Sequence, residues 1–385
     1  MSKSGGELKI VEAITAADRG KFIDLIYTLY KSDPNWVPPL RGEALELITG
    51  IEKNPWFGHG YAKFWMAMQD GKIVGRISAQ VDSLVLEHMG KGIGHWGMFE
   101  SIDDQRVADL LLNTAETWLR GEGMTSAMGP FSISIWDEPG LLVDGFDRPP
   151  TVMMGHHLNY YAKLIEAHGY AGIKDLHTYE LQIDKPFPDI VQRIVAASEK
   201  SGKIKTRMVE KSKFAEEAAI IMDILNDAWS ANWGFVPLTP LEVAHVGVKL
   251  KPIVYNDMIR IAEIDGEPVG FLISLPDLNE FTADLGGKLF PFNWAKLLWR
   301  LRKPKVRRIR VPLMGVRKSL QGSRLASIMV FQMIEYIRRT AVENYGAKRG
   351  EIGWILEDNG PMRSIADVIE AEVTKTYRIF ERSLV

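Results

Sequence analysis

The sequence predicts an α/β (α+β) protein built as two domains in tandem, and three observations lead to this fold class. A single hydrophobic core stops growing at roughly 250–300 residues, whereas the chain has 385. Hydrophobic residues make up 46% of the chain and charged residues 25%, a composition typical of globular proteins. The second half also matches the first in order when it is shifted back by about 195 residues.

The repeat begins with the same elements in both halves. An apolar-periodic helix is expected at Phe22–Tyr30 and at Ala218–Trp229, and each helix is followed by a segment that contains Asn-Trp and ends in Pro-Leu. A β-hairpin comes next, because Asp-Gly at Asp70 and at Asp265 separates two apolar runs. Asp-Gly favours the type I′ turn, which needs a positive φ at both central residues.

The remaining elements continue the repeat as a strand, a long helix, a strand, a short helix and a last strand. They are expected at 94–100, 104–121, 125–130, 160–168 and 176–183, and again at 309–316, 322–345, 350–357, 362–372 and 374–381. Two prolines lie between the halves in Asp184–Pro188, and prolines of this kind mark a boundary. We therefore predict an N-terminal domain at 1–185 and a C-terminal domain at 186–385.

Charge and composition exclude several classes of function. The 47 basic and 49 acidic residues leave a net charge of −2, so the chain as a whole offers no field for nucleic acid. Cysteine is absent, which removes disulfides and a thiol nucleophile, and no metal-ligand spacing occurs, so no metal is expected. The N-terminus lacks the apolar core of a signal peptide and no long apolar run follows, which predicts a cytoplasmic protein.

Two stretches of the second half resemble the GNAT superfamily of acyltransferases. Leu313–Ala326 is similar to the strand, pyrophosphate loop and helix start of that superfamily, and Asn359–Arg382 is similar to its closing motif. The resemblance implies that each domain is a mixed, mostly antiparallel sheet flanked by helices, and that the C-terminal domain binds acyl-CoA as co-substrate. The residues that it assigns to acyl-CoA are Met314, Val316, Arg317, Gln321, Gly322, Ser323, Arg324, Leu325 and Asn359.

The helix start at Gly322–Leu325 also suits a diphosphate for a physical reason. Its backbone N–H groups have no helical partner and lie at the positive end of the helix dipole. The resemblance implies that N–H groups near Met314 and Val316 bind the thioester oxygen. Arg324 occupies the place of a family glycine, and either contacts a phosphate or marks a rebuilt loop. At the equivalent point, 98–104, the first half has three carboxylates and no glycine loop, so we expect it to repel phosphate.

The segment Gly129–Pro150, together with the layout of the whole chain, resembles the bacterial ceramide-synthase-like group of double GNAT proteins. This resemblance implies an enzyme, an acyltransferase that moves a fatty acyl group from acyl-CoA to the amine of a long-chain lipid base. Two alternatives remain open: an N-acetyltransferase acting on a small-molecule or protein amine, and a non-catalytic acyl-CoA or lipid-binding protein.

Catalytic candidates come from the first half. Asp137 and Glu138 lie in a loop flanked by Gly and Pro, where one carboxylate either takes the proton of the amine or caps a turn. His157 precedes a helix and either relays a proton or lies at the surface. The tyrosine that many GNAT enzymes use as acid is missing from 368–373, and Tyr377 on the following strand is expected to be a packed structural residue.

An insert at 281–308 has no counterpart of its size in the first half. Aromatic and leucine residues alternate there with cations, and 288–310 contains nine Lys and Arg residues. Such a segment is typical of contact with an anionic membrane surface, here the inner face of the membrane. The alternative is an ordinary helix that packs Phe292, Leu298 and Trp299 inward.

Overall fold

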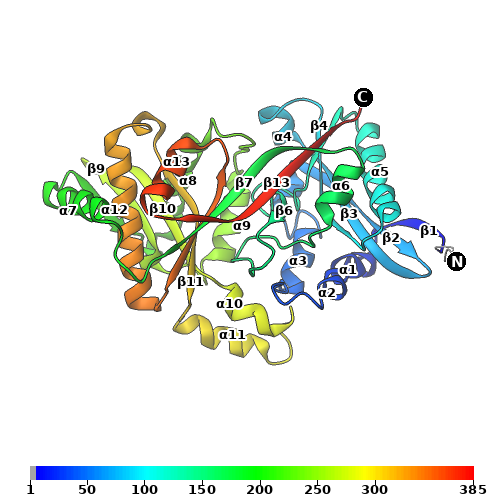
Figure 1. Cartoon of the computed structure of the whole chain (residues 1–385), viewed down its shortest axis with the longest axis horizontal. Helices are drawn as coiled ribbons and strands as arrows, with labels where there is room; N and C mark the ends of the chain where they lie inside the picture. The colour runs from blue at the N-terminus through cyan, green and yellow to red at the C-terminus, as the bar shows by residue number, and fades with distance from the viewer. Residues whose placement is uncertain (1–5) are drawn as a thin grey trace. The chain divides into compact units, whose positions relative to one another are not determined.

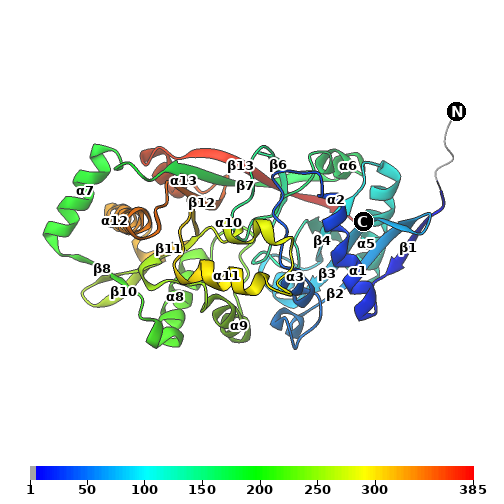
Figure 2. The same ribbon diagram turned by 90° about the horizontal axis from the view of Figure 1, so that it is seen from below.

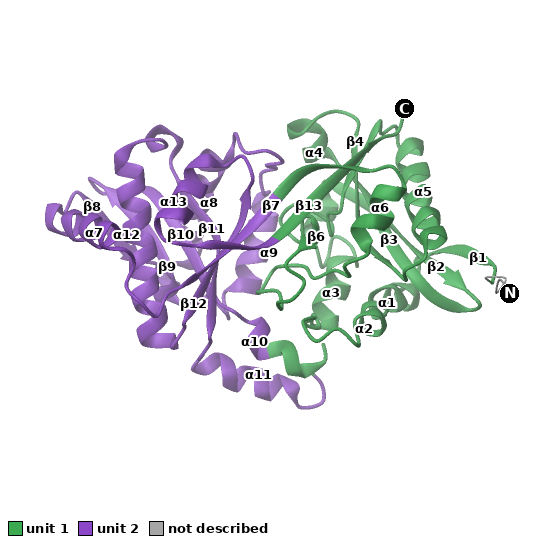
Figure 3. Ribbon diagram, in the orientation of Figure 1, with its two compact units in different colours: residues 1–175, 282–289, 376–385 green, residues 176–281, 290–375 purple. Residues whose placement is uncertain are grey.

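The computed structural model describes residues 6–385, and its elements follow the order of the sequence repeat (Figure 1). Packing divides the chain into two units (Figure 3). Unit 1 comprises Met1–Asp175, Thr282–Leu289 and Thr376–Val385, and unit 2 comprises Leu176–Phe281 and Phe290–Lys375.

The sheet of unit 1 is antiparallel except where β4 and β5 pair in parallel. Its strands, in spatial order, are β1 (Leu8–Glu12), β2 (Gly60–Gln69), β3 (Lys72–Asp82), β4 (Ile93–Ser101), β5 (Ser126–Gly129) and the later part of β13 (Glu372–Ser383), which also pairs with β6 (Leu141–Asp144). The helices are α1 (Ala16–Asp24), α2 (Ile26–Leu29), α3 (Arg41–Leu47), α4 (Ser83–His88), α5 (Gln105–Gly121) and α6 (Tyr161–Ala167), with short 3-10 turns at Pro55–Gly58 and Ala283–Leu285.

Helix α5 builds the main core of unit 1. The Asp104 side chain accepts a hydrogen bond from the Arg106 backbone N–H and begins the helix. Leu111 and Leu119 on its apolar face are fully buried in one cluster with Trp96 and Phe99 of β4. The helical period of three to four residues places these leucines on the face toward the sheet.

The sheet of unit 2 is antiparallel except where β11 and β12 pair in parallel. Its strands, in spatial order, are the later part of β7 (Ala171–Gln182), β12 (Arg349–Leu356), β11 (Arg308–Val316), β10 (Glu267–Pro276), β9 (Ile259–Ile264) and β8 (Ile204–Met208). The helices are α7 (Asp189–Ser201), α8 (Phe214–Trp229), α9 (Pro240–Leu250), α10 (Asn279–Thr282), α11 (Asn293–Arg302), α12 (Arg324–Thr340) and α13 (Gly360–Val368), with short turns at Lys211–Lys213, Asn256–Met258, Lys318–Leu320 and Ala341–Tyr345. Helices α7 and α12 cover one face of this sheet, and α8 and α9 cover the other (Figure 2).

Both predicted hairpins are confirmed. Asp70 and Gly71 join β2 to β3 with φ of 49° and 76°, and Asp265 and Gly266 join β9 to β10 with φ of 52° and 88°. All four central residues therefore have the positive φ that a type I′ turn requires.

The last strand of each repeat belongs to both units. The chain leaves unit 1 within β7, whose later part pairs with β12 from Leu176 opposite Leu356 to Gln182 opposite Arg349. It leaves unit 2 within β13, whose later part pairs with β5 from Phe380 to Ser383. Packing thus divides the chain at residue 175, and the boundary at 185 and 186 stays a proposal about the sequence repeat.

Candidate functional site

Two neighbouring parallel strands of unit 2, β11 and β12, separate halfway along their length. They pair from Arg308 opposite Arg349 to Val311 opposite Ile352, and the ladder ends there. Pro312 follows immediately, and it has no N–H with which to continue the ladder. Because β11 stays paired with β10 on its other edge as far as Val316, the part of β11 after Val311 borders a gap.

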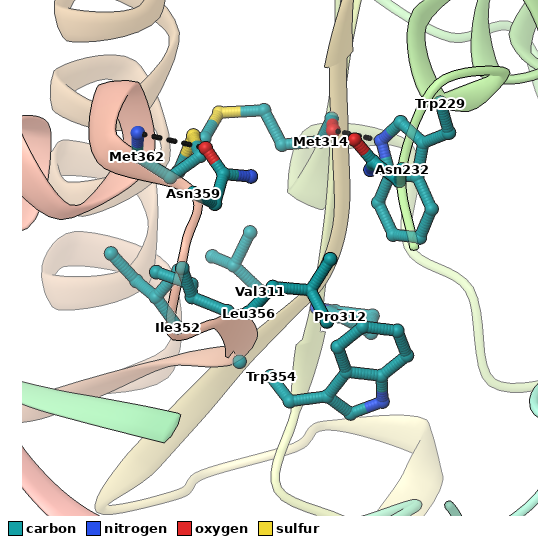
Figure 4. A pocket seen from close by; sticks show the side chains of 12 residues that line it. Trp229, Asn232, Val311, Pro312, Met314, Ile352, Trp354, Leu356, Asn359 and Met362 are labelled. Carbon is teal, nitrogen blue, oxygen red and sulfur yellow. Dashed lines mark hydrogen bonds between the residues drawn. The ribbon is translucent and has the colours of Figure 1, made fainter. Parts of the chain in front are cut away.

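A cavity of about 60 Å³, partly open to solvent, occupies this gap (Figure 4). We call it the first cavity. Its lining residues are Trp229, Asn232, Val311, Pro312, Met314, Ile352, Gly353, Trp354, Ile355, Leu356, Asn359 and Met362. The pairing of β12 with β7 shifts between Ile352 and Ile355, and Trp354 within this irregular stretch lies 6.2 Å from Trp229, ring centre to ring centre.

The edge of β11 along the first cavity carries backbone donors. The Arg317 N–H donates to the carbonyl oxygen of Val269 in β10 at 2.8 Å. Because backbone groups alternate direction along a strand, the N–H groups of Met314 and Val316 point to the opposite edge, where the gap lies. The Met314 carbonyl oxygen accepts a hydrogen bond from the Trp229 indole at 3.1 Å, which holds this edge in place (Figure 4).

The loop between β11 and α12 contains the predicted phosphate residues. Gly322 has φ of +74°, and no atom lies within 4 Å of the place where a Cβ would be. The Ser323 hydroxyl accepts from the Ala326 N–H at 3.1 Å and caps the helix. The N–H groups of Arg324 and Leu325 lie in the first turn of α12, where the helix provides no acceptor and the dipole favours an anion.

Arg324 occupies an ordinary helical position, because the positive φ of the loop falls on Gly322. No glycine is therefore needed at 324, and the exposed arginine adds a cation beside the helix start. Gln321 stabilises the loop, because its side-chain amide donates to the carbonyl oxygens of Ala228 and Val316, both at 3.0 Å. Arg317 is paired with Asp223 at 2.5 Å.

Asn359 lies at the opposite side of the first cavity. Its side-chain oxygen accepts from the Met362 N–H at 3.2 Å and caps α13. Figure 4 shows its amide nitrogen directed toward Met314, so this group adds a donor to the wall of the cavity.

The structure brings two of the three catalytic candidates together in unit 1. Both side chains lie close to Gly155. If this glycine had a Cβ atom, that atom would be 3.7 Å from a carboxylate oxygen of Glu138 and 3.7 Å from Nε2 of His157. Asp137 instead takes part in a turn, because its carboxylate accepts from the backbone N–H and hydroxyl of Ser134 at 3.2 and 2.7 Å.

The pKa values of Glu138 and His157 both differ from those of free side chains. The pKa of Glu138 is raised, first by loss of hydration and then by the Glu100 carboxylate, while Arg76 lowers it. The side chain still has solvent access, so protein atoms surround Glu138 without sealing it off. Burial and His156 lower the pKa of His157 to about 3. The His157 Nδ1 accepts from the Leu142 N–H at 3.0 Å, which assigns the ring proton to Nε2.

A buried polar cluster that the sequence reasoning missed lies in unit 1. The hydroxyls of Tyr30 and Tyr161 donate to the same Glu100 oxygen at 2.8 and 2.7 Å, and Arg76 lies 3.5 Å from the other oxygen. Burial raises the pKa of Glu100, although these three partners oppose that shift. A glutamate near the end of a mostly apolar strand was the signal that the sequence offered. Tyr377 is packed, as expected, and its hydroxyl donates to the Gly155 carbonyl oxygen at 3.0 Å.

The insert places large apolar side chains in solvent. Phe290, Phe292 and Trp299 are each exposed by 78–79%, and Leu298 and Trp294 are exposed by 60% and 46%. The alternative in which Phe292, Leu298 and Trp299 pack inward is therefore wrong. Leu297 and Leu301 face the core instead, because the helical period puts them on the opposite side of α11.

Two searches of the described residues have negative results. Within residues 6–385 no group of three or more His, Asp or Glu side chains is arranged to hold a metal ion. Nor does that part of the chain contain a helix long and apolar enough to cross a membrane.

Comparison with known proteins gives two full-length relatives. The chain is 41% identical over 382 residues to "Bacterial ceramide synthase" of Caulobacter vibrioides (strain NA1000 / CB15N), covering 99% of both chains. It is 43% identical over 372 residues to "Protein YghO" of Escherichia coli (strain K12), covering 95% of this chain and 93% of that protein. No protein-family model matches the chain.

Solved structures resemble the fold. A tandem GNAT protein from the clavulanic acid biosynthesis pathway superposes with a TM-score of 0.57 at 13% identity, covering 98% of this chain and 99% of that one. A GCN5-related N-acetyltransferase from Sphaerobacter thermophilus superposes with a TM-score of 0.53 at 12% identity, covering 98% and 96%. At such identities the likeness concerns the fold alone, and it confirms the predicted tandem arrangement of two GNAT domains.

Proposed function

Because the chain belongs to the family of the bacterial ceramide synthase of Caulobacter vibrioides, we propose that it is the acyltransferase that moves a fatty acyl group from acyl-CoA to the amine of a long-chain lipid base. The family membership confirms the resemblance carried by Gly129–Pro150. The observation that supports the proposal best is the gap between β11 and β12, where backbone donors border a cavity beside a helix start suited to a diphosphate.

The donor substrate is assigned to unit 2. The diphosphate of acyl-CoA would accept hydrogen bonds from the backbone N–H groups of Gly322, Arg324 and Leu325, and Arg324 would add a cation. The Ser323 N–H already donates to the Leu320 carbonyl oxygen at 3.1 Å. The thioester would lie along β11, where the N–H groups of Met314 and Val316 are directed into the first cavity. Donors held in place before the reaction stabilise the oxyanion that forms when the amine attacks, because they need no reorganisation.

Glu138 is proposed as the base that takes the proton of the acceptor ammonium. A carboxylate with a raised pKa is a stronger base than an ordinary one, and solvent access lets an amine reach it. The neutral His157 does not repel a cation, and its Nε2–H remains on the side of Gly155. The freed amine attacks the thioester carbonyl carbon and the C–N bond forms. The C–S bond then breaks to release CoA as a thiolate, which takes the second proton that the nitrogen loses as it becomes an amide.

The test is turnover of two defined substrates. Mixing the purified chain with palmitoyl-CoA and sphinganine should release free CoA thiol and an equal amount of N-acyl product, measured by thiol titration and mass spectrometry. Tight CoA binding without turnover on any amine would support the binding protein instead. Turnover with acetyl-CoA alone would support the N-acetyltransferase.

Peripheral membrane contact through α11 is a second part of the proposal, and with it a place at the cytoplasmic face of the membrane. Long-chain bases are held in membranes, and α11 presents exposed Phe, Trp and Leu side chains among cations. Each cation near an anionic surface contributes about 1 kcal/mol. Vesicles with anionic lipid should co-sediment with the chain more than neutral ones.

A double variant, Phe292→Ser with Trp299→Ser, should lose that co-sedimentation. Leu241→Ser is the control, since Leu241 on α9 is also an apolar side chain with high exposure, 70%. Equal losses in both variants would contradict the role of α11.

A further inference from the structure

The end of α8 lies close to the part of β11 that borders the first cavity. We call the backbone of residues 312–316 on the side of this cavity the gap edge. Gly315 permits the close approach, because a Cβ there would lie 2.7 Å from the Phe271 ring and 3.3 Å from the Cβ of Ala228 on α8. A side chain at 315 would therefore press the strand away from both neighbours.

The gap edge carries acceptors as well as donors. The N–H and the C=O of one residue in a strand point to the same side. Met314 and Val316 therefore direct their carbonyl oxygens, and not only their N–H groups, away from β10. A carbonyl oxygen without a partner would lie near any thioester oxygen bound by these N–H groups, and the two partial negative charges would repel each other.

Both carbonyl oxygens of the gap edge already accept a hydrogen bond. The Met314 oxygen accepts from the Trp229 indole N–H at 3.1 Å (Figure 4). The Val316 oxygen accepts from the Gln321 side-chain amide at 3.0 Å. Two side chains thus take over the place that the ladder with β12 leaves open, and they satisfy the acceptors of the gap edge.

Helix α8 anchors both of these side chains. Trp229 is the last residue of α8. The Gln321 amide donates a second hydrogen bond to the Ala228 carbonyl oxygen at 3.0 Å, which belongs to the last turn, where the helix itself provides no donor. The Asp227 carboxylate also accepts from the Lys318 backbone N–H at 2.7 Å. The helix end, the loop after β11 and the gap edge are therefore held together before any substrate binds.

We propose that Trp229 and Gln321 are positioning residues for acyl transfer, which occupy the carbonyl oxygens of the gap edge so that it offers the thioester N–H donors only. This inference rests on the proposed function. Each residue acts through the backbone of β11 and not through the reacting atoms. Negative charge on the thioester oxygen grows in the transition state, so a freed carbonyl oxygen should cost more there than in the bound ester. The loss should therefore appear mainly in kcat.

The experiment compares two variants with a control on the same helix. Trp229→Phe keeps an aromatic ring and removes the indole N–H, and Gln321→Met keeps the side-chain length and removes the amide. Ile224→Val is the matched control, because Ile224 is fully buried on α8 and has no polar atom, so its loss of a methyl group loosens packing without freeing a carbonyl oxygen. Thermal unfolding shows that each variant has folded.

Three quantities are measured on the whole chain. They are kcat and KM with palmitoyl-CoA and sphinganine, the Kd for CoA by calorimetry, and the infrared carbonyl band of bound palmitoyl-CoA labelled with ¹³C at the thioester carbon, without an amine. Hydrogen bonds to a carbonyl oxygen move its band to lower wavenumber. The band therefore reports the donors of the gap edge, and a contact with the diphosphate does not move it.

Both variants should lower kcat about tenfold, less than the roughly 100- to 1000-fold cost of removing an oxyanion donor itself. Both should also move the carbonyl band toward that of the ester free in solution, whereas Ile224→Val should keep the wild-type band and kcat. Trp229→Phe should leave the Kd for CoA unchanged.

A wild-type band in both variants, or the same shift in Ile224→Val, would overturn the role of the gap edge and leave the proposed function standing. Weaker CoA binding with an unchanged band in Gln321→Met would make Gln321 a substrate contact and overturn its positioning role. A wild type that binds palmitoyl-CoA without turnover would overturn the proposed function, while the band would still decide the role of the gap edge. Failure to bind any CoA ester would overturn both.

Discussion

Replacement of Gly322 tests whether a diphosphate binds at the start of α12. Gly322→Asp introduces a charge beside the helix start, and the open space around this position means that the side chain meets no steric barrier. The positive φ of +74° is the complication, because a non-glycine residue there carries a conformational cost of its own. Gly322→Asn is the matched control, since Asn has nearly the same shape, tolerates this backbone region and bears no charge.

The difference between the two variants isolates the charge. A carboxylate at about 4–5 Å from a phosphate oxygen interacts by about 1–3 kcal/mol at an exposed site, which weakens binding about 5- to 150-fold. Calorimetric titration with CoA should therefore give a Kd for Gly322→Asp that exceeds that of Gly322→Asn by this factor, and the factor should shrink at 1 M salt. Equal affinities of the two variants would refute the assignment of the diphosphate to this loop.

The remaining predictions concern unit 1. Glu138→Gln should lower kcat about 100-fold or more with the unfolding midpoint unchanged. In the wild type, activity should fall as the pH drops below the raised pKa of Glu138, because the base must be ionised. Glu100→Gln should move that acid limb to lower pH, because the Glu100 charge raises the pKa of Glu138. An acid limb that stays in place would show that another group is the base. Tyr161→Phe should cost about 1–3 kcal/mol in urea unfolding, since it removes a buried donor to Glu100; a loss below about 0.5 kcal/mol would contradict this. His157 should remain neutral down to about pH 3, so its ring resonances in NMR spectra should not shift between pH 8 and pH 5.

Local features of the fold were predictable because neighbouring residues determine them. The Asp70-Gly71 turn has the predicted backbone angles, and the expected helix at 104–121 is α5 at Gln105–Gly121. The loop at Gly322 has the positive φ that a glycine permits. In each case the conformation depends on residues that are close together in the sequence, so the sequence pattern is enough to predict it.

The candidate site was predictable only in part. Met314 and Val316 were expected from resemblance, and the structure directs their N–H groups into a gap. Gln321 was expected to bind acyl-CoA, but its hydrogen bonds to Ala228 and Val316 hold the loop itself in place. A contact between Gln321 and the substrate stays part of the proposal. The cluster around Glu100 joins residues 30, 76 and 161, and no local pattern reports contacts of that separation.

By itself the sequence determined the repeat, the hairpins and the glycine loop, because periodicity and turn chemistry are properties of neighbouring residues. It also determined the class of reaction, because the motifs that resemble a known family are short segments of the sequence. Only the tertiary structure decided that β7 and β13 each belong to both units, that Glu138 and His157 both lie close to Gly155, and that a cavity lies where β11 and β12 separate. These features depend on which strand edges pair and which side chains share a space. A strand presents two edges that are chemically alike, so its partner is chosen by the packing of the whole domain.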